Sequence, residues 1–312
     1  MPHQAIHAGP SPAALPEGAL AAVPGDFPLP GTGREAVVAV PAPGRGPQHW
    51  AGSSSAALDA DGTFVVGYRT RVTENDHAAT VVARSEDGGR METVATLDKD
   101  RFGAMSMERP AVVRTDDGRW HLYVCSAMPG SKHWWIDLLV ADDPAGFADA
   151  EPQTVFPGDD TVAVKDPVVR LADGRWEAWI CCHPLDEPDE EDRMTTAYAS
   201  SEDGIAWDWR GTALAPRPGR WDARGARVTA VLPDGRASYD GRATKDENWF
   251  ERTGLARSAG EPGRLVQVNE APASHVRYLD VLPLPNGGYR IWYEAPLPDE
   301  SHELRTELID PR

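Results

Sequence analysis

Five Asp-Gly or Asn-Gly pairs recur along the chain, and each separates two short apolar segments. The pairs are Asp61-Gly62, Asp117-Gly118, Asp173-Gly174, Asp234-Gly235 and Asn286-Gly287. They return roughly every 55 residues, and a period in this range is typical of a repeat fold. A chain with this pattern therefore contains five copies of one structural unit.

Each pair has the surroundings of a tight β-hairpin. In residues 110–123 and 167–179, a β-branched run leads into Asp-Gly-Arg-Trp and then into a run with aromatic residues at alternate positions. Asp-Gly permits the positive φ that such a turn needs. A third run, as in residues 79–88 and 195–204, ends in Ser-Glu-Asp-Gly before a further strand. Each copy is therefore predicted to be a four-stranded antiparallel meander.

Five such sheets arranged radially would form an all-β, five-bladed β-propeller. A β-sandwich is the main competitor, but a sandwich has no reason to repeat a whole four-strand unit. The last copy supplies its third strand near residues 304–309, so we expect the N-terminal run 35–40 to be its outer strand and to close the ring. The predicted domain spans residues 35–312, and the Pro/Ala/Gly-rich residues 1–34 are predicted to be a flexible tail.

Charge and composition exclude several classes of function. The net charge of −18 leaves no basic stripe for nucleic acid, and no window approaches the ~18 apolar residues that would cross a membrane. Residues 1–34 lack the features of a signal peptide. Two of the three cysteines, Cys181 and Cys182, are adjacent, so the sequence indicates no disulfide framework. These observations favour a cytoplasmic protein.

Strand order predicts which face holds a functional site. Loops that enter the first strand of each copy, and loops that join its second and third strands, open on one face of the disc. The Asp-Gly and Ser-Glu-Asp-Gly turns lie on the opposite face, so turn chemistry alone explains their aspartates.

The loops of the first face are polar and uneven. Blade one offers only the serines 53–55 at the start of its first strand, and the other blades offer Glu108-Arg109, Lys165-Asp166, Arg224 with Arg227, and His275 with Arg277. The loops between second and third strands of the five copies add Arg69, Arg71 and His77, then His133, His183, Tyr239-Asp240 with Arg242, and Glu294 with His302.

Four segments make the chain resemble a known superfamily. These are Lys165-Asp-Pro-Val-Val followed by Asp173-Gly-Arg-Trp, the turn 199–207, Tyr239-Asp-Gly-Arg and Trp292-Tyr-Glu-Ala. The chain resembles the five-bladed propeller glycosidases of glycoside hydrolase families 43, 32, 62, 68 and 130. The resemblance spans the repeat region, and its motifs are more specific for the fold than for one activity.

The resemblance implies a general acid and a base or nucleophile on opposite sides of a sugar ring, because the oxocarbenium-like transition state needs both. Asp166 matches the Asp-Pro position of the third blade, and Glu108 lies one residue before the equivalent position of the second. Asp240 and Glu294 are the further candidates. Blade one, where these families commonly place an essential aspartate, has serines around Ser54.

Many cations are predicted on this face of an otherwise acidic protein, and guanidinium groups bind carboxylates and phosphates well. We therefore predict a small anionic substrate. Alternatively, the arginines pair with Glu108, Asp166, Asp222 and Asp240. The predicted substrate-binding residues are Arg69, His77, Arg109, His133, Lys165, Arg224, Arg227, Tyr239, Arg242, His275 and Arg277.

Two functions remain open. The first is a glycosidase-like enzyme that cleaves or transfers a glycosidic bond. The second is a propeller with a rebuilt site that acts on, or only binds, a non-carbohydrate anionic metabolite. No phosphate-binding glycine loop follows a strand, and the loop histidines of this face show no His-x-x-x-His spacing, so no cofactor and no metal are predicted.

Overall fold

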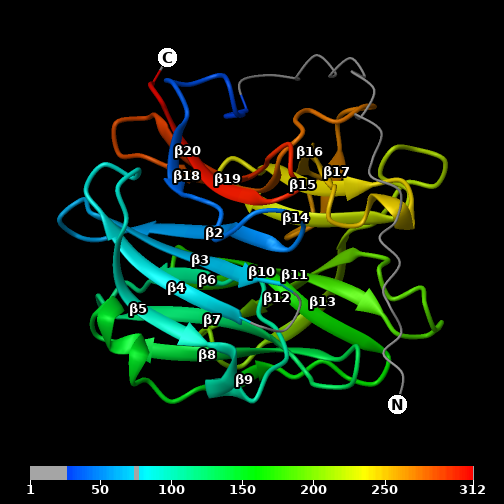
Figure 1. The fold of residues 1–312 in the computed structure, drawn as a ribbon, viewed down its shortest axis with the longest axis horizontal. Coiled ribbons are helices and arrows are strands. Elements are labelled where there is room, and N and C mark those ends of the chain that lie inside the picture. The colour runs from blue at the N-terminus through cyan, green and yellow to red at the C-terminus, as the bar shows by residue number, and fades with distance from the viewer. Residues whose placement is uncertain (1–26, 74–76, 312) are drawn as a thin grey trace.

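The fold is built almost entirely of antiparallel β-strands (Figure 1). The computed structural model describes residues 27–73 and 77–311. In these residues the only helical segments are three short 3-10 helices, η1 (Lys99–Phe102), η2 (Pro144–Ala148) and η3 (Lys245–Glu247). The all-β class predicted from the sequence is confirmed.

The strands form consecutive four-stranded groups, here called sheets 1 to 5. Sheet 1 contains β2 (His49–Leu58), β3 (Phe64–Val72), β4 (His77–Ser85) and β5 (Glu92–Asp98). Sheet 2 contains β6 (Ala111–Arg114), β7 (Trp120–Ala127), β8 (Trp134–Ala141) and β9 (Gln153–Phe156). Sheet 3 contains β10 (Val162–Ala172), β11 (Arg175–Pro184), β12 (Thr195–Ser201) and β13 (Asp208–Leu214).

Sheet 4 contains β14 (Gly225–Val231), β15 (Arg236–Arg242), β16 (Arg252–Ser258) and β17 (Leu265–Gln267). Sheet 5 contains β18 (Arg277–Pro283), β19 (Tyr289–Pro296), β20 (His302–Ile309) and β1 (Val37–Val40). β1 pairs antiparallel with β20, as predicted for the run 35–40. A single parallel bridge between Trp50 and His302 joins sheets 1 and 5 into one eight-stranded sheet.

The repeated Asp-Gly and Asn-Gly pairs form the hairpin turns between the first and second strands of the sheets. Every glycine of these pairs has a positive φ, from 71° at Gly174 to 89° at Gly62 and Gly118. Asp173 also has a positive φ, of 52°, so its two-residue turn has the left-handed conformation at both positions that a type I′ turn requires. The turns between third and fourth strands are likewise structural, because Asp87 and Asp203 accept backbone N–H groups of the turn.

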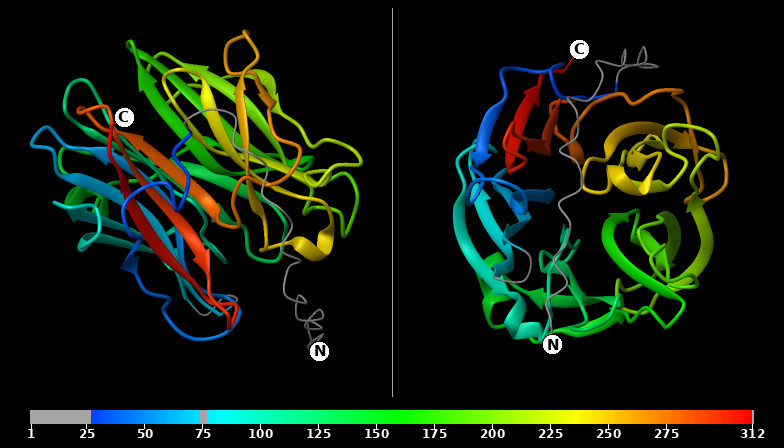
Figure 2. Two further views of the ribbon diagram at one scale, coloured as in Figure 1. Left: turned by 90° about the horizontal axis from the view of Figure 1, so that it is seen from above. Right: turned by 45° about the vertical axis from the view of Figure 1, so that its right-hand side comes forward.

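Each sheet packs against the next through a buried apolar cluster. Alternate residues of one strand point to opposite faces, so Leu122 of β7 packs in the cluster between sheets 1 and 2, and Tyr123 packs between sheets 2 and 3. The cluster between sheets 5 and 1 includes Phe64 and Trp292. The first strands also contact one another in order, β2 with β6, β6 with β10, β10 with β14, β14 with β18, and β18 with β2. Figure 2 shows the sheets distributed around a common centre.

Residues 27–34, part of the tail predicted from the sequence, pack against sheets 4 and 5. Phe27 and Leu29 are buried in the cluster between these sheets. The backbone N–H of Gly31 donates to Glu307, and Arg34 forms an ion pair of 2.7 Å with Asp310. The rest of the predicted tail, residues 1–26, lies outside the described residues.

Three first strands are interrupted by a residue in the left-handed region. Ser53 in β2, Asp166 in β10 and Tyr278 in β18 have φ values of 49°, 52° and 50°, and the strand register shifts at each of them. A bulge of this kind re-aims the neighbouring side chains. Asp166 and Tyr278 are thereby brought into the centre of the molecule.

Candidate functional site

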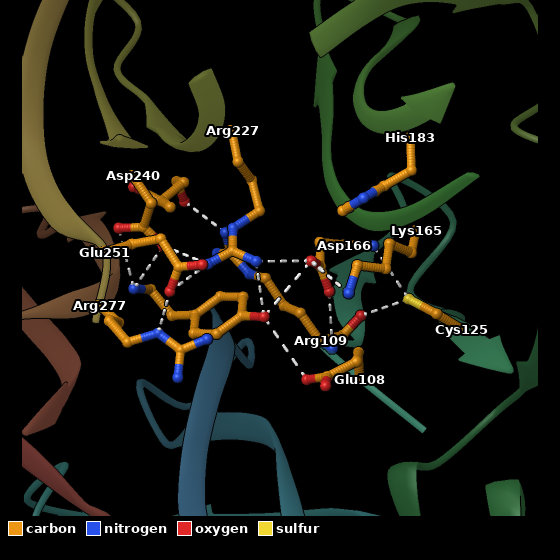
Figure 3. Close-up of polar contacts among 12 residues, drawn as sticks. Glu108, Arg109, Cys125, Lys165, Asp166, His183, Arg227, Asp240, Glu251 and Arg277 are labelled. Atoms are coloured by element: carbon orange, nitrogen blue, oxygen red, sulfur yellow. Dashed lines mark hydrogen bonds and ion pairs between the residues drawn. The ribbon is translucent and has the colours of Figure 1, made fainter. Parts of the chain in front are cut away.

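A dense cluster of charged side chains fills the centre, where the first strands meet (Figure 3). The structure brings together ten of the residues predicted from the sequence, and almost all of them are buried. They are Glu108, Asp166, Asp240, Glu294, Arg69, Arg109, Lys165, Arg227, Arg242 and Arg277.

Glu108 lies just before β6 and is bound by two arginines. Arg71 donates to its Oε1 at 2.8 Å, and Arg69 Nη1 lies 3.2 Å from its Oε2. Burial acts to raise the pKa of Glu108, but Arg69, Arg71, Lys165 and Arg277 outweigh burial and lower this pKa well below its usual range. Glu108 is therefore a carboxylate anion at neutral pH.

Asp166 and Asp240 share Arg227, whose guanidinium lies between them in Figure 3. Arg227 donates to Asp166 at 3.0 Å and to Asp240 at 2.7 Å, and all three side chains are buried. Burial raises the pKa of Asp240, and Arg227 only partly opposes it. This arrangement satisfies both carboxylates with one guanidinium fork.

Tyr278 links the carboxylates of Glu108 and Asp166. Its hydroxyl lies 3.5 Å from Glu108 Oε2 and 3.3 Å from Asp166 Oδ2, and it accepts a hydrogen bond of 2.8 Å from Arg227. One hydroxyl group is thus within reach of both carboxylates. Asp166 has no exposed surface, however, and Glu108 retains 6%.

A second group of ion pairs surrounds Glu251 and Glu294. Arg242 and Arg277 bind Glu251, and Arg69, Arg277 and His302 bind Glu294. Burial acts to raise the pKa of Glu294, but these three partners lower it to about 2. The pKa of Glu251 is likewise lowered, against burial, by Arg277, Arg242 and Arg227, so both glutamates are anionic and held in ion pairs.

The Arg109 side chain binds parts of three sheets rather than a ligand. It donates to the carbonyl groups of Ser54 and Thr229 and to Asp280, at 3.0, 2.7 and 3.2 Å. Burial raises the pKa of Asp280 to about 6 despite Arg109. Arg109 is buried and holds the first strands together.

A cavity of about 400 Å³ opens beside this cluster. Of the four predicted catalytic carboxylates, Glu108 is the one that lines it. Trp134 and Trp249 supply aromatic surface, and the remaining lining is mostly charged. The polar and charged lining side chains include Arg71, Ser106, Lys132, Lys165, His183, Asp189, Glu191, Asp192, Lys245 and Asn248.

Of the eleven predicted binding residues, Lys165 alone lines the cavity, and five others lie outside both the lining and the central cluster. His77 of β4 pairs with Asp98 of β5, His133 contacts the Pro157 carbonyl, and His275 is exposed. Tyr239 is buried in the core and donates to Asp222. Arg224 pairs with Glu190 and Asp192 at the rim.

The prediction missed Tyr278, Glu251, Trp134 and Trp249. Glu251 and Trp249 belong to the loop between the second and third strands of sheet 4, so a complete inventory of those loops would have found them. Tyr278 follows the predicted Arg277, and only the bulge turns it toward the centre.

The geometry suits stabilisation of positive charge better than proton donation. Glu108 is anionic and reaches the cavity, so it can face a developing oxocarbenium ion or orient a nucleophile. Asp240 and Asp280 have raised pKa values, the condition for a general acid near neutral pH, but neither lines the cavity.

Neither a metal site nor a membrane span appears in the part of the chain that the structure describes. The described residues contain no group of three or more His, Cys, Asp or Glu side chains that could hold a metal ion. No helix in residues 27–73 and 77–311 has the length and apolarity needed to cross a bilayer.

No protein-family model and no curated protein matches the sequence. Solved structures of carbohydrate-active enzymes do match the fold. A β-1,2-mannobiose phosphorylase from Listeria innocua is 14% identical with a TM-score of 0.55, and the match covers 83% of this chain and 89% of that one. A glycosyl hydrolase from Bacteroides ovatus is 14% identical with a TM-score of 0.57, over 88% and 91% of the two chains.

A sucrose-6-phosphate hydrolase from Lactobacillus gasseri is 9% identical with a TM-score of 0.62, over 86% of this chain and 60% of that one. The structural overlap establishes a common fold, and identities this low leave the activity open. The resemblance noted in the sequence is confirmed at that level: the chain has the fold of the propeller glycosidases and glycoside phosphorylases.

Proposed function

We propose that this chain is a carbohydrate-active enzyme that cleaves or transfers a glycosidic bond in the cavity beside Glu108. The main support is the position of Glu108, which combines contact with the cavity, proximity to Asp166 through Tyr278, and two tryptophans in the same cavity wall. Sugar rings present apolar C–H faces and polar edges, and a cavity with both aromatic and charged walls complements them.

In this proposal Glu108 acts as the anionic group that faces the oxocarbenium-like transition state. Arg69, Arg71 and Tyr278 hold Glu108 in place, and Asp166, Asp240 and Glu294 keep the surrounding arginines fixed. The names of the structural neighbours support both hydrolysis and transfer to phosphate as reactions of this fold.

We also propose that the five sheets form a closed five-bladed ring. The support is the cyclic order of contacts between first strands and the apolar cluster between sheets 5 and 1. A cytoplasmic location remains part of the proposal, with support from the three free cysteines, Cys125, Cys181 and Cys182.

The proposal that the substrate is anionic has support from fewer residues than the sequence predicted. Arg69, Arg227 and Arg277 are each paired with carboxylates, so the support comes from Lys132 in the cavity wall. Sucrose 6-phosphate and glycosides of uronic acids, compared with their neutral counterparts, test this part of the proposal.

A panel of aryl glycosides and disaccharides, assayed with and without inorganic phosphate, tests the function. Glu108→Gln is expected to lower kcat by at least about 100-fold, because it removes the charge that faces the transition state. Glu202→Gln, in an exposed turn, is the matched control and should retain full activity. Activity that survives Glu108→Gln would remove the site assignment.

One observation favours the alternative of a binding protein. All four predicted catalytic carboxylates are engaged by arginine or by a shared tyrosine, as in a site that has lost its free acid. A wild-type protein that binds saccharides or anionic metabolites in calorimetry, and turns over no member of the panel, would establish this alternative.

A further inference from the structure

His183 and Lys165 project from the same face of sheet 3. Ala163 of β10 lies opposite His183 of β11, and Lys165 is two residues farther along β10. Side chains two residues apart on a strand share a face, and diagonal neighbours across a strand pair lie close enough for long side chains to meet. Both residues line the cavity beside Glu108.

The backbone fixes the tautomer of His183. Its Nδ1 lies 2.7 Å from the carbonyl oxygen of Glu191, and a carbonyl oxygen can only accept, so Nδ1 carries the proton and donates it. Burial and the Lys165 ammonium also hold the pKa of His183 well below its usual range, so the ring is neutral. Nε2 is therefore a bare acceptor, and it is buried without a hydrogen-bond partner among the described residues.

Lys165 provides the complementary donor. Its Nζ lies 3.9 Å from Asp166 Oδ2, beyond hydrogen-bond distance, and 4.7 Å from the centroid of the Trp134 ring. Its side chain is only 14% exposed, and no hydrogen bond of the ammonium occurs within residues 27–73 and 77–311. An ammonium group has three N–H donors, and leaving them without hydrogen bonds on a mostly buried side chain is costly.

An adjacent donor and bare acceptor match one chemical group, a hydroxyl. The hydroxyl oxygen can accept from Lys165 while its proton is donated to His183 Nε2. A phosphate or carboxylate suits this pair less well, because the lone pair of Nε2 would face the negative oxygen.

We propose that Lys165 Nζ and His183 Nε2 form a subsite for one hydroxyl group of the sugar, and so select a neutral polyol edge at this wall of the cavity. This inference rests on the proposed carbohydrate function and names the recognition chemistry of the same cavity. Trp134, beneath the Lys165 ammonium, supplies the apolar surface next to that hydroxyl.

Two substitutions of His183 distinguish the role of its Nε2 acceptor from the role of its Nδ1 hydrogen bond to Glu191. In His183→Asn the amide N–H₂ replaces Nδ1 as the donor to Glu191, and nothing replaces Nε2. In His183→Gln the longer side chain can place its amide oxygen near the former Nε2. His49→Gln, a partly buried histidine that lies outside the cavity lining, is the control.

Calorimetry would compare the binding of β-1,2-mannobiose, sucrose, methyl β-D-mannopyranoside, methyl β-D-glucopyranoside and inorganic phosphate to these proteins. For a sugar that binds, His183→Asn should weaken binding by roughly 10- to 100-fold, with recovery in His183→Gln. One monodeoxy form of that sugar should bind both proteins about equally, because it lacks the hydroxyl that Nε2 would accept. Unchanged thermal unfolding would show that the variants are folded.

Each other outcome contradicts the inference in its own way. Equal sugar binding by wild type and His183→Asn overturns the subsite and leaves the proposed function intact. Weaker phosphate binding with unchanged sugar binding makes the pair an anion site. Absence of both sugar binding and turnover in the wild type removes the proposed function together with the subsite. Independently of any ligand, ¹⁵N NMR should find His183 Nε2 unprotonated, and a protonated Nε2 would also overturn the inference.

Discussion

Glu294 illustrates how a buried carboxylate becomes part of the framework rather than a free acid. Arg69, Arg277 and His302 surround it, and its side chain has no exposed surface. Desolvation alone would favour the neutral acid, but the three partners favour the anion and lower its pKa to about 2. The native state therefore binds this proton less readily than the unfolded chain.

Because the pKa of Glu294 differs between the folded and unfolded states, the free energy of unfolding should decrease at acidic pH. The stabilisation is complete above the ordinary glutamate pKa and is lost as the pH falls toward about 2, so Glu294 contributes a loss of about 2 kcal/mol between pH 5 and pH 3. Glu294→Gln should be less stable at pH 7 and should lose less stability over that interval. Urea unfolding at both pH values measures the difference. Parallel losses in the two proteins would contradict the assigned pKa.

Trp249 combines exposure with an unusual backbone. It is 36% exposed, lines the cavity and has a φ of 73°, a conformation that is rare for a bulky residue. Strain of this kind often occurs at functional sites. Trp249→Ala should weaken sugar binding roughly 3- to 10-fold, from loss of the aromatic surface, with little change in stability.

Trp249→Gly is the matched variant, because glycine tolerates the positive φ. Its sugar affinity should fall as in Trp249→Ala, and its stability should be equal or higher. Calorimetry and thermal unfolding together check this prediction. Undiminished sugar affinity in both variants would show that Trp249 does not contact the ligand.

At the scale of strands, local chemistry made the hairpins predictable from the sequence. An Asp-Gly or Asn-Gly pair specifies its turn with its own two residues. The order of the strands, and the face of the molecule opposite these turns on which the polar loops lie, could therefore be predicted from the pairs. The pairing of β1 with β20 was also predictable, because sheet 5 lacked a fourth strand.

The partners of the central charges were not predictable from the same pattern. Counting residues back from each turn assumes regular strands, whereas β2, β10 and β18 contain bulges at Ser53, Asp166 and Tyr278. Each bulge shifts the count by a residue and changes which side chain points to the centre. The partners of Arg227 also come from three separate sheets, so the spacing of residues within one strand or turn cannot predict them.

β1 and the segment before it should stabilise sheet 5. Removal of residues 1–41 deletes the strand paired with β20 and the buried side chains of Phe27 and Leu29, at a cost of roughly 3–6 kcal/mol for the two side chains alone. The exposed edge of β20 should also promote aggregation. Thermal unfolding and light scattering check both effects. A chain that starts at residue 27 is the control, and equal stability of the two truncated chains would contradict the prediction.

For the whole molecule, the contact between sheets 5 and 1 decides whether the sheets unfold together. Trp292 is fully buried there, packs on Phe64 and donates to the Gly88 carbonyl at 2.9 Å. Trp292→Ala should cost about 3–5 kcal/mol, and unfolding should remain a single transition. Trp209→Ala, at a side chain that is 49% exposed, should change stability by less than about 0.5 kcal/mol. A separate early transition in Trp292→Ala would show that sheet 5 unfolds alone.

The pairing of β1 with β20 has a consequence for the order of folding. Sheets 1 to 4 are each formed from one continuous stretch of chain, so each can form as soon as its own strands have been synthesised. Sheet 5 needs strands that are separated by almost the whole sequence, and contacts at such separation form slowly. Among the strands of residues 27–73 and 77–311, β1 is synthesised first and its partner β20 last, so we expect the last of these sheets to assemble to contain the earliest of these strands.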